Sequence, residues 1–192
     1  LMDFCYSIVG HIYGGLAHVN VLSSMIFAGI SGSAVADTAG VSGMFMPEMI
    51  RKGYSKNFTV AVTAISSTIG IIIPPSIPMV VIAGICGIST GKLFLGGIIP
   101  GIVIFLAFCG IIGWLSYHHD FPRSPSLTRQ ERVRAVLDAG PAGRIPASIS
   151  ASILGGFATP TEAATVASLL AILIGLFVYR EMTLADIWPA LV

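Results

Sequence analysis

The chain has 192 residues, of which 55% are hydrophobic and only 10% are charged, with a formal net charge of +1 at pH 7. Soluble domains carry about 25% charged residues, so this composition excludes an ordinary soluble domain and indicates an all-α, polytopic protein of a lipid bilayer. The near-neutral charge gives no indication of a nucleic-acid partner. Cys5, Cys86 and Cys109 are far apart without metal-site or redox spacing, and we expect them to be small buried apolar residues.

The first region, residues 1–56, begins with an uncharged run that extends over residues 4–36. It predicts two apolar helices, at 14–30 and 33–50, each short for a membrane crossing of about 20 residues. Between them lies a small polar turn, Ser31-Gly32-Ser33. Either both helices cross the membrane, or they form a re-entrant hairpin whose tip ends inside the protein. The small size of the turn favours the hairpin, because small residues allow close packing.

The second region, residues 57–91, predicts a transmembrane helix that is broken in the middle. Two half-helices are expected at 58–69 and 77–88, separated by Gly70 and the pair Pro74-Pro75. Proline removes a backbone donor and disfavours helix in the residue before it. Backbone groups freed from helical bonding are costly in lipid unless they face protein or a water-filled cavity. Paired interruptions of this kind are typical of the ion and substrate site of a secondary transporter.

The later part of the chain predicts a helical pair joined by a tight turn. Residues 145–158 are uncharged but contain few large apolar side chains, whereas 163–179 predict a clear helix. Thr159, Pro160 and Glu162 predict a capping box with proline at the first helical position. The expected segments are a crossing at 92–117, a basic cytoplasmic loop at 118–144, the helical pair at 145–180 and an interfacial helix at 181–192.

Positive charge gives the expected orientation. If 58–88 and 93–117 each cross once, eight basic residues share one side of the membrane and Lys92 lies on the other. If 145–158 crosses too, Arg180 lies on the same side as these eight residues. The eight stay on one side whether the first region re-enters or spans the membrane twice. Because basic loops stay in the cytoplasm, we expect a multi-pass protein of the bacterial inner membrane with these loops on the cytoplasmic side. The eight residues are Arg51, Lys52, Lys56, Arg123, Arg129, Arg132, Arg134 and Arg144.

Both breaks offer the groups that a cation and a carboxylate need. The end of one helix presents carbonyl oxygens that can coordinate Na⁺, and the start of the next presents N–H groups that can hold a carboxylate. The structural interpretations are a close helix contact at the first break and a proline-kinked helix at the second. The candidate cation- and substrate-binding residues are Ser31, Gly32, Ser33, Asp37, Ser66, Ser67, Thr68, Gly70, Pro74 and Pro75, with Na⁺ expected near Ser31, Ser33, Ser66 and Ser67.

Asp37 and three further polar residues lie within the first two expected helices. Asp37 is an acid among apolar residues, which makes it a functional candidate by default, either as support for a cation or as an acceptor at the helix tip. Glu48, next to Arg51-Lys52, is expected to be an interfacial anchor. His18 and Asn20 either line a cavity or, as we favour, form helix-to-helix hydrogen bonds.

Three further functional classes are consistent with parts of the sequence. Gly29-Ile30-Ser31-Gly32 matches the short serine motif of rhomboid-type intramembrane proteases, but such an enzyme needs a histidine within reach of the serine. The later histidines, His118 and His119, lie at a helix end beside a basic loop. We therefore expect no enzyme. A channel built on half-helices and a purely structural membrane subunit are the second and third classes.

The chain resembles the large membrane subunit of tripartite ATP-independent periplasmic (TRAP) transporters. The resemblance covers nearly the whole chain and is carried by strings in the order found in that family. The strings are Gly14-Gly15-Leu16-Ala17-His18-Val19-Asn20-Val21, Ser31-Gly32-Ser33-Ala34-Val35-Ala36-Asp37, Ser66-Ser67-Thr68-Ile69-Gly70 continuing to Ile73-Pro74-Pro75-Ser76-Ile77-Pro78, and Ala158-Thr159-Pro160-Thr161-Glu162-Ala163-Ala164.

The resemblance implies Na⁺-coupled uptake of a small organic acid, such as a C4-dicarboxylate or sialic acid, with no cofactor beyond the coupling ion. It implies two protein partners, a periplasmic solute-binding protein and a small membrane subunit. It also implies an elevator-type fold of two inverted repeats, each with a re-entrant hairpin and a broken helix. The first hairpin would then carry Ser31-Gly32-Ser33, and the first broken helix would carry residues 66–76.

The sequence departs from the family pattern in three ways. It covers about the first repeat with connecting helices, so half of the expected site is missing and we do not expect this segment to transport alone. Residues 139–152 are poorer in large apolar residues than the family's helix there, which puts that crossing in question. Ile71 stands where family members usually have proline.

Overall fold

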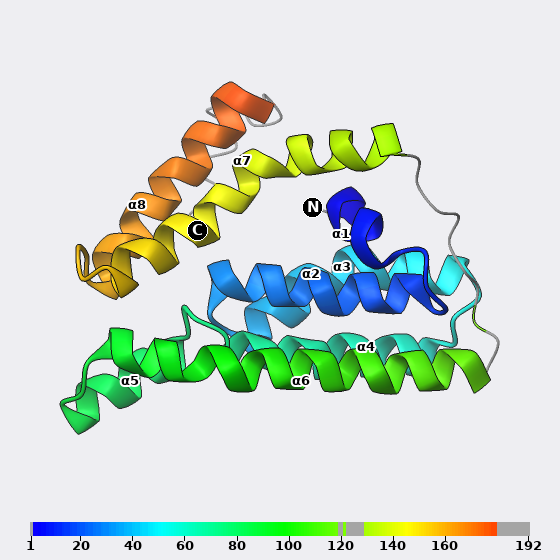
Figure 1. Cartoon of the computed structure of the whole chain (residues 1–192), viewed down its shortest axis with the longest axis horizontal. Coiled ribbons are helices and arrows are strands. Elements are labelled where there is room, and N and C mark those ends of the chain that lie inside the picture. Colours follow the sequence, from blue (N-terminus) through cyan, green and yellow to red (C-terminus); the bar gives the residue numbers. More distant parts are fainter. Residues whose placement is uncertain (1, 119–120, 122–128, 180–192) are drawn as a thin grey trace.

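The computed structural model describes residues 2–118, 121 and 129–179, and this part of the chain is helical without a β-strand. The expected all-α class is thus confirmed for the described residues. Figure 1 shows the elements in chain order: α1 (Met2–Val9), α2 (Gly15–Ser31), α3 (Ala34–Arg51), α4 (Lys56–Ser67), the 3₁₀ turn η1 (Thr68–Ile71), α5 (Ile77–Cys86), α6 (Thr90–His118), α7 (Arg129–Leu154), α8 (Pro160–Leu173) and the π-helical turn η2 (Ile174–Tyr179).

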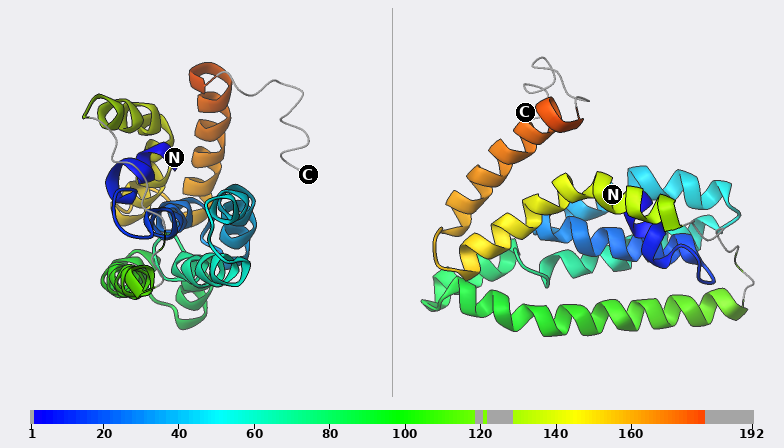
Figure 2. Two further views of the ribbon diagram at one scale, coloured as in Figure 1. Left: turned by 90° about the vertical axis from the view of Figure 1, so that its right-hand side faces the viewer. Right: turned by 45° about the horizontal axis from the view of Figure 1, so that its top comes forward.

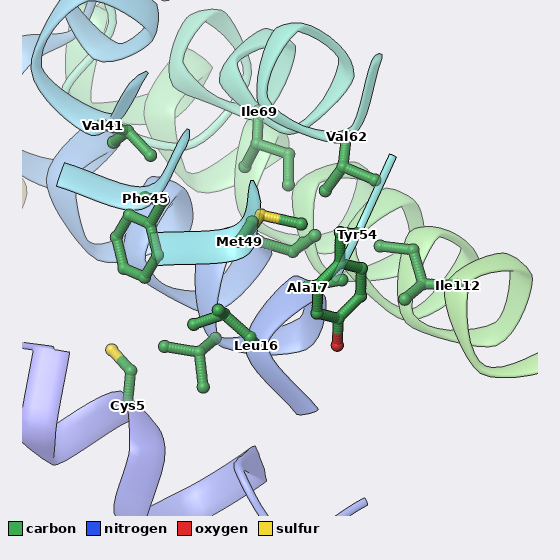
Figure 3. Packing of buried hydrophobic residues seen from close by; sticks show 12 residues of the cluster. Cys5, Leu16, Ala17, Val41, Phe45, Met49, Tyr54, Val62, Ile69 and Ile112 are labelled. Carbon is green, nitrogen blue, oxygen red and sulfur yellow. The ribbon is translucent and has the colours of Figure 1, made fainter. Parts of the chain in front are cut away.

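The helices α2, α3 and α4 pack against one another and form the main core. Apolar side chains from all three meet there and are almost completely buried, and Figure 3 shows how they face one another. α1 also packs on α2. Because each of the three helices is in contact with the other two, their ends are held at fixed positions. Core residues labelled in Figure 3 include Leu16, Phe45, Met49, Val62 and Ile69.

α6 runs along the outside of this unit, and α7 pairs with α8 and also packs on α1, α2 and α6 (Figures 1 and 2). Two of the described helical segments are long and apolar enough to cross a membrane, namely Thr90–His118 and Pro160–Tyr179. Large apolar side chains such as Ile99, Leu106 and Phe177 are mostly exposed on them. A soluble protein would bury such surfaces, so these helices have the character of membrane-facing segments.

The helix α7 corrects one expectation from the sequence. It begins at Arg129, within the segment expected to be a basic loop, and runs unbroken to Leu154 through Pro141. Arginine, glutamate, glutamine, alanine and leucine dominate its first turns and are strong helix formers, although they show no apolar periodicity. Its second half packs with α6 and α8 through Phe94, Ile149 and Ile153.

Several expectations fall on parts of the chain outside the described residues. They include most of the connection before α7, Arg180, and the interfacial helix at 181–192. α7 is long enough to cross a membrane, with 26 residues, but it is not apolar enough to be one of the candidate spans. The crossing at 145–158 therefore stays a prediction.

Candidate functional site

The first break separates α2 from α3 by two residues, Gly32 and Ser33. Gly32 has φ +60° and its N–H donates to the carbonyl of Ala28 at 3.1 Å, which ends α2. Glycine is favoured there because a Cβ is strained in the left-handed region. Ser33 is extended and caps α3, its Oγ accepting from the N–H of Ala36 at 3.5 Å. The local chemistry of these two residues thus produces the break that the sequence predicts.

The second break lies between α4 and α5. The helix tightens into the 3₁₀ turn η1, and α5 starts again at Ile77. Ser76 caps α5, accepting from the N–H of Met79 at 3.4 Å, while its own hydroxyl donates to the carbonyl of Ile71 at 2.7 Å. Pro74 and Pro75 lie in the stretch between the two helices, where their missing N–H groups leave no helical bond unmade.

The two breaks are in direct contact. The N–H of Ile77 donates to the carbonyl of Gly32 at 3.1 Å, which joins the start of α5 to the tip of the α2–α3 hairpin. A Cβ on Gly32 would lie only 2.8 Å from the carbonyl oxygen of Pro75. Gly70 lies close to the tip, where a Cβ would stand 3.6 Å from the carbonyl oxygen of Ser33. Segments about 45 residues apart in the chain therefore form one structure.

A cavity of about 450 Å³ opens beside this contact. Ser31, Gly32, Pro75 and Ser76 line one side, and mainly apolar residues of α7 and α8 line the other. The polar side chains on its wall are Ser31, Ser76 and Ser168, and the other lining side chains are apolar. A mainly apolar cavity with a few polar groups is typical of a site for a small organic molecule.

A buried polar cluster, which we call the Asp37 cluster, lies between α2, α3 and α4. Asp37 is fully buried, and neither of its carboxylate oxygens has a hydrogen-bond partner. Ser24 and Ser67 neighbour the carboxylate without donating a hydrogen bond to it. The cluster consists of Ser24 from α2, Asp37 from α3, and Ser66 and Ser67 from α4. Asn20 and Thr63 form a second buried polar pair on α2 and α4, next to Met49.

Two hydroxyl protons of the cluster have a backbone acceptor. Ser66 and Ser67 both donate to the carbonyl of Thr63, at 3.0 and 2.9 Å. The Oγ atoms of Ser24 and Ser66 lie 3.0 Å apart and form one hydrogen bond, in which either atom can donate. The hydroxyl oxygens of Ser66 and Ser67 thus keep lone pairs for a further contact.

An arrangement of this kind fits a small hard cation. A buried carboxylate is costly unless it is paired, and within the described residues no ion pair involves Asp37. Both unpartnered atoms of Asp37 are oxygens, and the cluster adds the hydroxyl oxygens of Ser24, Ser66 and Ser67. Oxygen is the ligand type that hard cations prefer. Asp37 lies in the first turn of α3, whose positive dipole end favours the carboxylate. The carboxyl-terminal ends of α2 and α4, next to the two breaks, present the negative ends of two further dipoles.

Most of the predicted site residues thus lie in one of two adjoining places, the cavity or the Asp37 cluster. Ser31 and Ser33 are half-buried at the tip, where the Ser31 hydroxyl lies 3.4 Å from the Ser33 carbonyl oxygen and donates to it. Thr68 does not belong to either place, because its side chain is exposed and donates to the carbonyl of Ile65. One residue of helical rotation turns it away from Ser67.

The other polar candidates have local structural partners. Glu48 forms ion pairs with Arg51 and Lys52 at the end of α3, as an anchoring role requires. Asn20 donates to Thr63 Oγ1 at 2.8 Å. The ring nitrogens of His18 lie 3.2 and 3.1 Å from the carbonyl oxygens of Gly14 and Cys109. Helix-to-helix bonding is therefore confirmed for both.

The expected burial of the cysteines is confirmed for two of the three. Cys5 is buried and Cys109 half-buried as expected, but Cys86 is exposed, because it ends the short helix α5, whose surface is largely uncovered.

A proteolytic serine needs a neighbouring histidine, whereas the Ser31 hydroxyl donates to the Ser33 carbonyl within the tip. The rings of His18 and His118 lie against backbone carbonyls, that of His118 against Trp114.

Sequence reasoning missed Ser24, which belongs to the Asp37 cluster, and Thr63, whose carbonyl accepts from Ser66 and Ser67. A signal for them exists in the spacing. Asn20 and Ser24 are four residues apart on α2, and Thr63 and Ser67 have the same spacing on α4. That spacing places two polar side chains on one face of a helix. Two polar stripes on otherwise apolar helices indicate that the helices face each other along them.

The turn before α8 has the predicted capping box. Thr159 accepts from the N–H of Glu162 at 3.4 Å, and Glu162 accepts from the N–H of Thr159 at 2.8 Å. We expect Thr159→Ala to lower the stability of α8 by about 1 kcal/mol, because a cap bond is lost. Thermal unfolding in detergent would measure this loss. Thr165→Ala is the control, since that exposed hydroxyl only donates to the carbonyl of Thr161 within the helix, and an equal effect of both changes would contradict the capping role.

Exposed apolar helices around buried polar helix breaks are typical of membrane transport proteins. The model of the family described as "Tripartite ATP-independent periplasmic transporter, DctM component" matches residues 1–192, and the chain belongs to this family. It is therefore a member of a family of permeases and not of enzymes.

Curated relatives agree with this assignment. The chain is 37% identical over 188 residues to the sialic acid TRAP transporter permease protein SiaT of Haemophilus influenzae, covering 98% of the chain and 30% of that protein. It is 37% identical over 192 residues to the 2,3-diketo-L-gulonate TRAP transporter large permease protein YiaN of Escherichia coli, covering 100% of the chain and 45% of the relative. It is 38% identical over 186 residues to the C4-dicarboxylate TRAP transporter large permease protein DctM of Pseudomonas aeruginosa, covering 97% of the chain and 44% of that relative. The chain thus spans less than half the length of these relatives.

Proposed function

We propose that this chain supplies one half of the transport site of a permease that couples uptake of a small organic acid to a Na⁺ gradient. The observation that carries the proposal is the Asp37 cluster, a fully buried carboxylate without a partner, beside two helix breaks that touch. Na⁺ would bind among the oxygens of Asp37, Ser66 and Ser67, with carbonyls near Ser31 and Ser33. No cofactor is needed beyond this coupling ion.

The substrate we propose is a carboxylate or a related small organic anion. The cavity beside the breaks is mainly apolar, with Ser31, Ser76 and Ser168 on its wall, and would hold the organic part of such a molecule. The relatives carry acids in their names, among them sialic acid, C4-dicarboxylate and 2,3-diketo-L-gulonate. Pro74 and Pro75 would keep the break rigid, while Gly32 and Gly70 would permit the close contact.

Transport also requires the rest of the permease. In this proposal α2 and α3 form a re-entrant hairpin, α4 and α5 form a broken helix, and an inverted second repeat supplies the other half of an elevator-type site. A periplasmic binding protein delivers the substrate, and a small membrane subunit supports the large one. The protein lies in the bacterial inner membrane with its basic loops in the cytoplasm, as the distribution of lysine and arginine favours.

The proposal is tested at two adjacent hydroxyl residues, of which Ser67 is buried and Thr68 is exposed. In a complete permease that carries this sequence, reconstituted with its partners, Ser67→Ala should raise the Na⁺ concentration for half-maximal uptake about tenfold, the value for a loss of roughly 1.4 kcal/mol. Thr68→Ala should leave it unchanged, because the Thr68 side chain is exposed. Uptake of radiolabelled C4-dicarboxylate or sialic acid into proteoliposomes measures both.

The same assay distinguishes the other classes of membrane protein. A channel would pass substrate without a Na⁺ gradient, and a purely structural subunit would tolerate both changes equally. Either result would overturn the proposed function.

A further inference from the structure

The first half of α6 lies against the second break, the stretch between α4 and α5. The buried residues of this half are Phe94, Gly97 and Gly101, whose spacing of three and four places them on one face of the helix. α6 packs on both η1 and α5, and Figure 1 shows α5 beside the start of α6. Because glycine has no side chain, the two backbones can approach closely on this face.

Gly97 faces the backbone of the break. A Cβ on Gly97 would lie 2.6 Å from the carbonyl oxygen of Ile72 and 2.6 Å from Met79 Cε. Gly97 lies inside the α-helix, where alanine is a better helix former than glycine. The helix itself thus does not need a glycine at this position, whereas the neighbouring carbonyl does.

Two other glycines of α6 differ from Gly97 in what surrounds them. A Cβ on Gly101 would lie 2.5 Å from Cγ1 of Ile73, a side-chain atom that can move more easily than a backbone carbonyl. A Cβ on Gly96 would meet nothing within 4 Å. The three positions therefore form a graded series on one helix, with the strictest contact at Gly97.

The carbonyl that meets Gly97 is closely linked to the hairpin tip. Ile77 follows Ile72 by five residues, and its N–H donates to the carbonyl of Gly32 at 3.1 Å. The segment between them contains two prolines, whose rings fix φ, and the Ser76 hydroxyl donates back to the carbonyl of Ile71 at 2.7 Å. A displacement of the Ile72 carbonyl is therefore transmitted to the contact between the two breaks.

We propose that Gly97 is a positioning residue of the transport site. By admitting the Ile72 carbonyl, it lets α6 hold the second break at the place where Ile77 meets the hairpin tip. The inference rests on the proposed function for its effect on transport, whereas the contact itself is measured without Na⁺ or substrate.

The first measurement is hydrogen exchange of the Ile77 amide in a complete permease that carries this sequence. Few other amides contribute to a peptide of this region, because the segment 74–78 contains three prolines, which have no N–H. Gly97→Ala should speed the exchange about tenfold, because the bond to Gly32 opens more often once the break is displaced.

The other two glycines supply the controls. Gly96→Ala should leave the exchange unchanged, since its methyl group enters open space. Gly101→Ala should speed the exchange less than Gly97→Ala, because the Ile73 side chain can turn aside. Gly101→Ala also carries the test if Gly97→Ala does not fold.

The second measurement is the Na⁺ concentration for half-maximal uptake into proteoliposomes. Gly97→Ala should raise it about tenfold, because binding groups that are slightly misplaced lose much of their effect. Gly96→Ala should leave it unchanged. A glycine with a merely structural role would lower the unfolding temperature in detergent without changing this Na⁺ concentration.

Three results would overturn the inference. One is unchanged exchange of the Ile77 amide in Gly97→Ala, and another is an equal increase in Gly96→Ala. The third is faster exchange in Gly97→Ala with an unchanged Na⁺ concentration for half-maximal uptake. Uptake by the unaltered protein without Na⁺ would instead overturn the proposed function, and the exchange result would still decide whether α6 holds the break.

Discussion

Replacing Asp37 by asparagine in a complete permease should lower Na⁺-dependent uptake by at least about a hundredfold, equivalent to roughly 2.7 kcal/mol. The carboxylate is the charged member of a buried set of oxygens, and its own oxygens have no other partner. Asparagine keeps the shape but removes the charge that would hold a cation. Uptake into proteoliposomes at a Na⁺ concentration that saturates the unaltered protein measures the effect.

The same variant has a second, independent signature. An unpaired buried charge destabilises a protein, so Asp37→Asn should unfold at a temperature equal to or above that of the unaltered protein when Na⁺ is absent. Na⁺ should stabilise the unaltered protein, because a ligand that binds only the folded state raises its stability, and should not stabilise the variant. Glu48→Gln is the matched control on the same helix, since Glu48 is paired with Arg51 and Lys52. Normal uptake by Asp37→Asn, or equal losses in both variants, would contradict a cation site at Asp37.

Gly32→Ala should separate the two breaks and reduce uptake by about tenfold or more. The φ of +60° costs an L-residue about 1–2 kcal/mol. In addition, the new methyl group would lie 2.8 Å from the Pro75 carbonyl oxygen and 3.2 Å from the Ile77 nitrogen. The hydrogen bond from Ile77 to Gly32 then has to lengthen or break. Uptake and thermal unfolding in detergent together measure the two effects.

Gly87→Ala separates backbone strain from the loss of contact. Gly87 has a similar φ of +65°, but a Cβ there meets nothing within 4 Å. We expect it to lose similar stability from strain while keeping most of its uptake activity. If Gly32→Ala lost no more uptake than Gly87→Ala, the contact between the breaks would have no role in transport.

Local chemistry made both breaks predictable from the sequence. Gly32 ends α2 because only glycine adopts its φ without strain, and Ser33 and Thr159 begin helices because their hydroxyls accept the first free N–H groups. These effects act within four residues of the chain. The expected helices at 14–30 and 33–50 accordingly match α2 and α3 to within one residue at each end.

Contacts between distant segments were harder to predict. Whether Ser67 or Thr68 faces the interior depends on how α4 is rotated against α2, and adjacent residues on a helix differ by about 100°. The role of Ser24 depends on Ser66, which is 42 residues away. The course of α7 past Arg129 was missed because its first turns show no apolar periodicity, although their residues favour helix.

Binding of radioactive sodium to a purified complete permease tests most directly whether the buried oxygens around Asp37 form a cation site. We predict saturable binding in the unaltered protein, its retention in Glu48→Gln, and its loss in Asp37→Asn. Binding by Asp37→Asn with unchanged affinity would contradict a cation site built on this carboxylate.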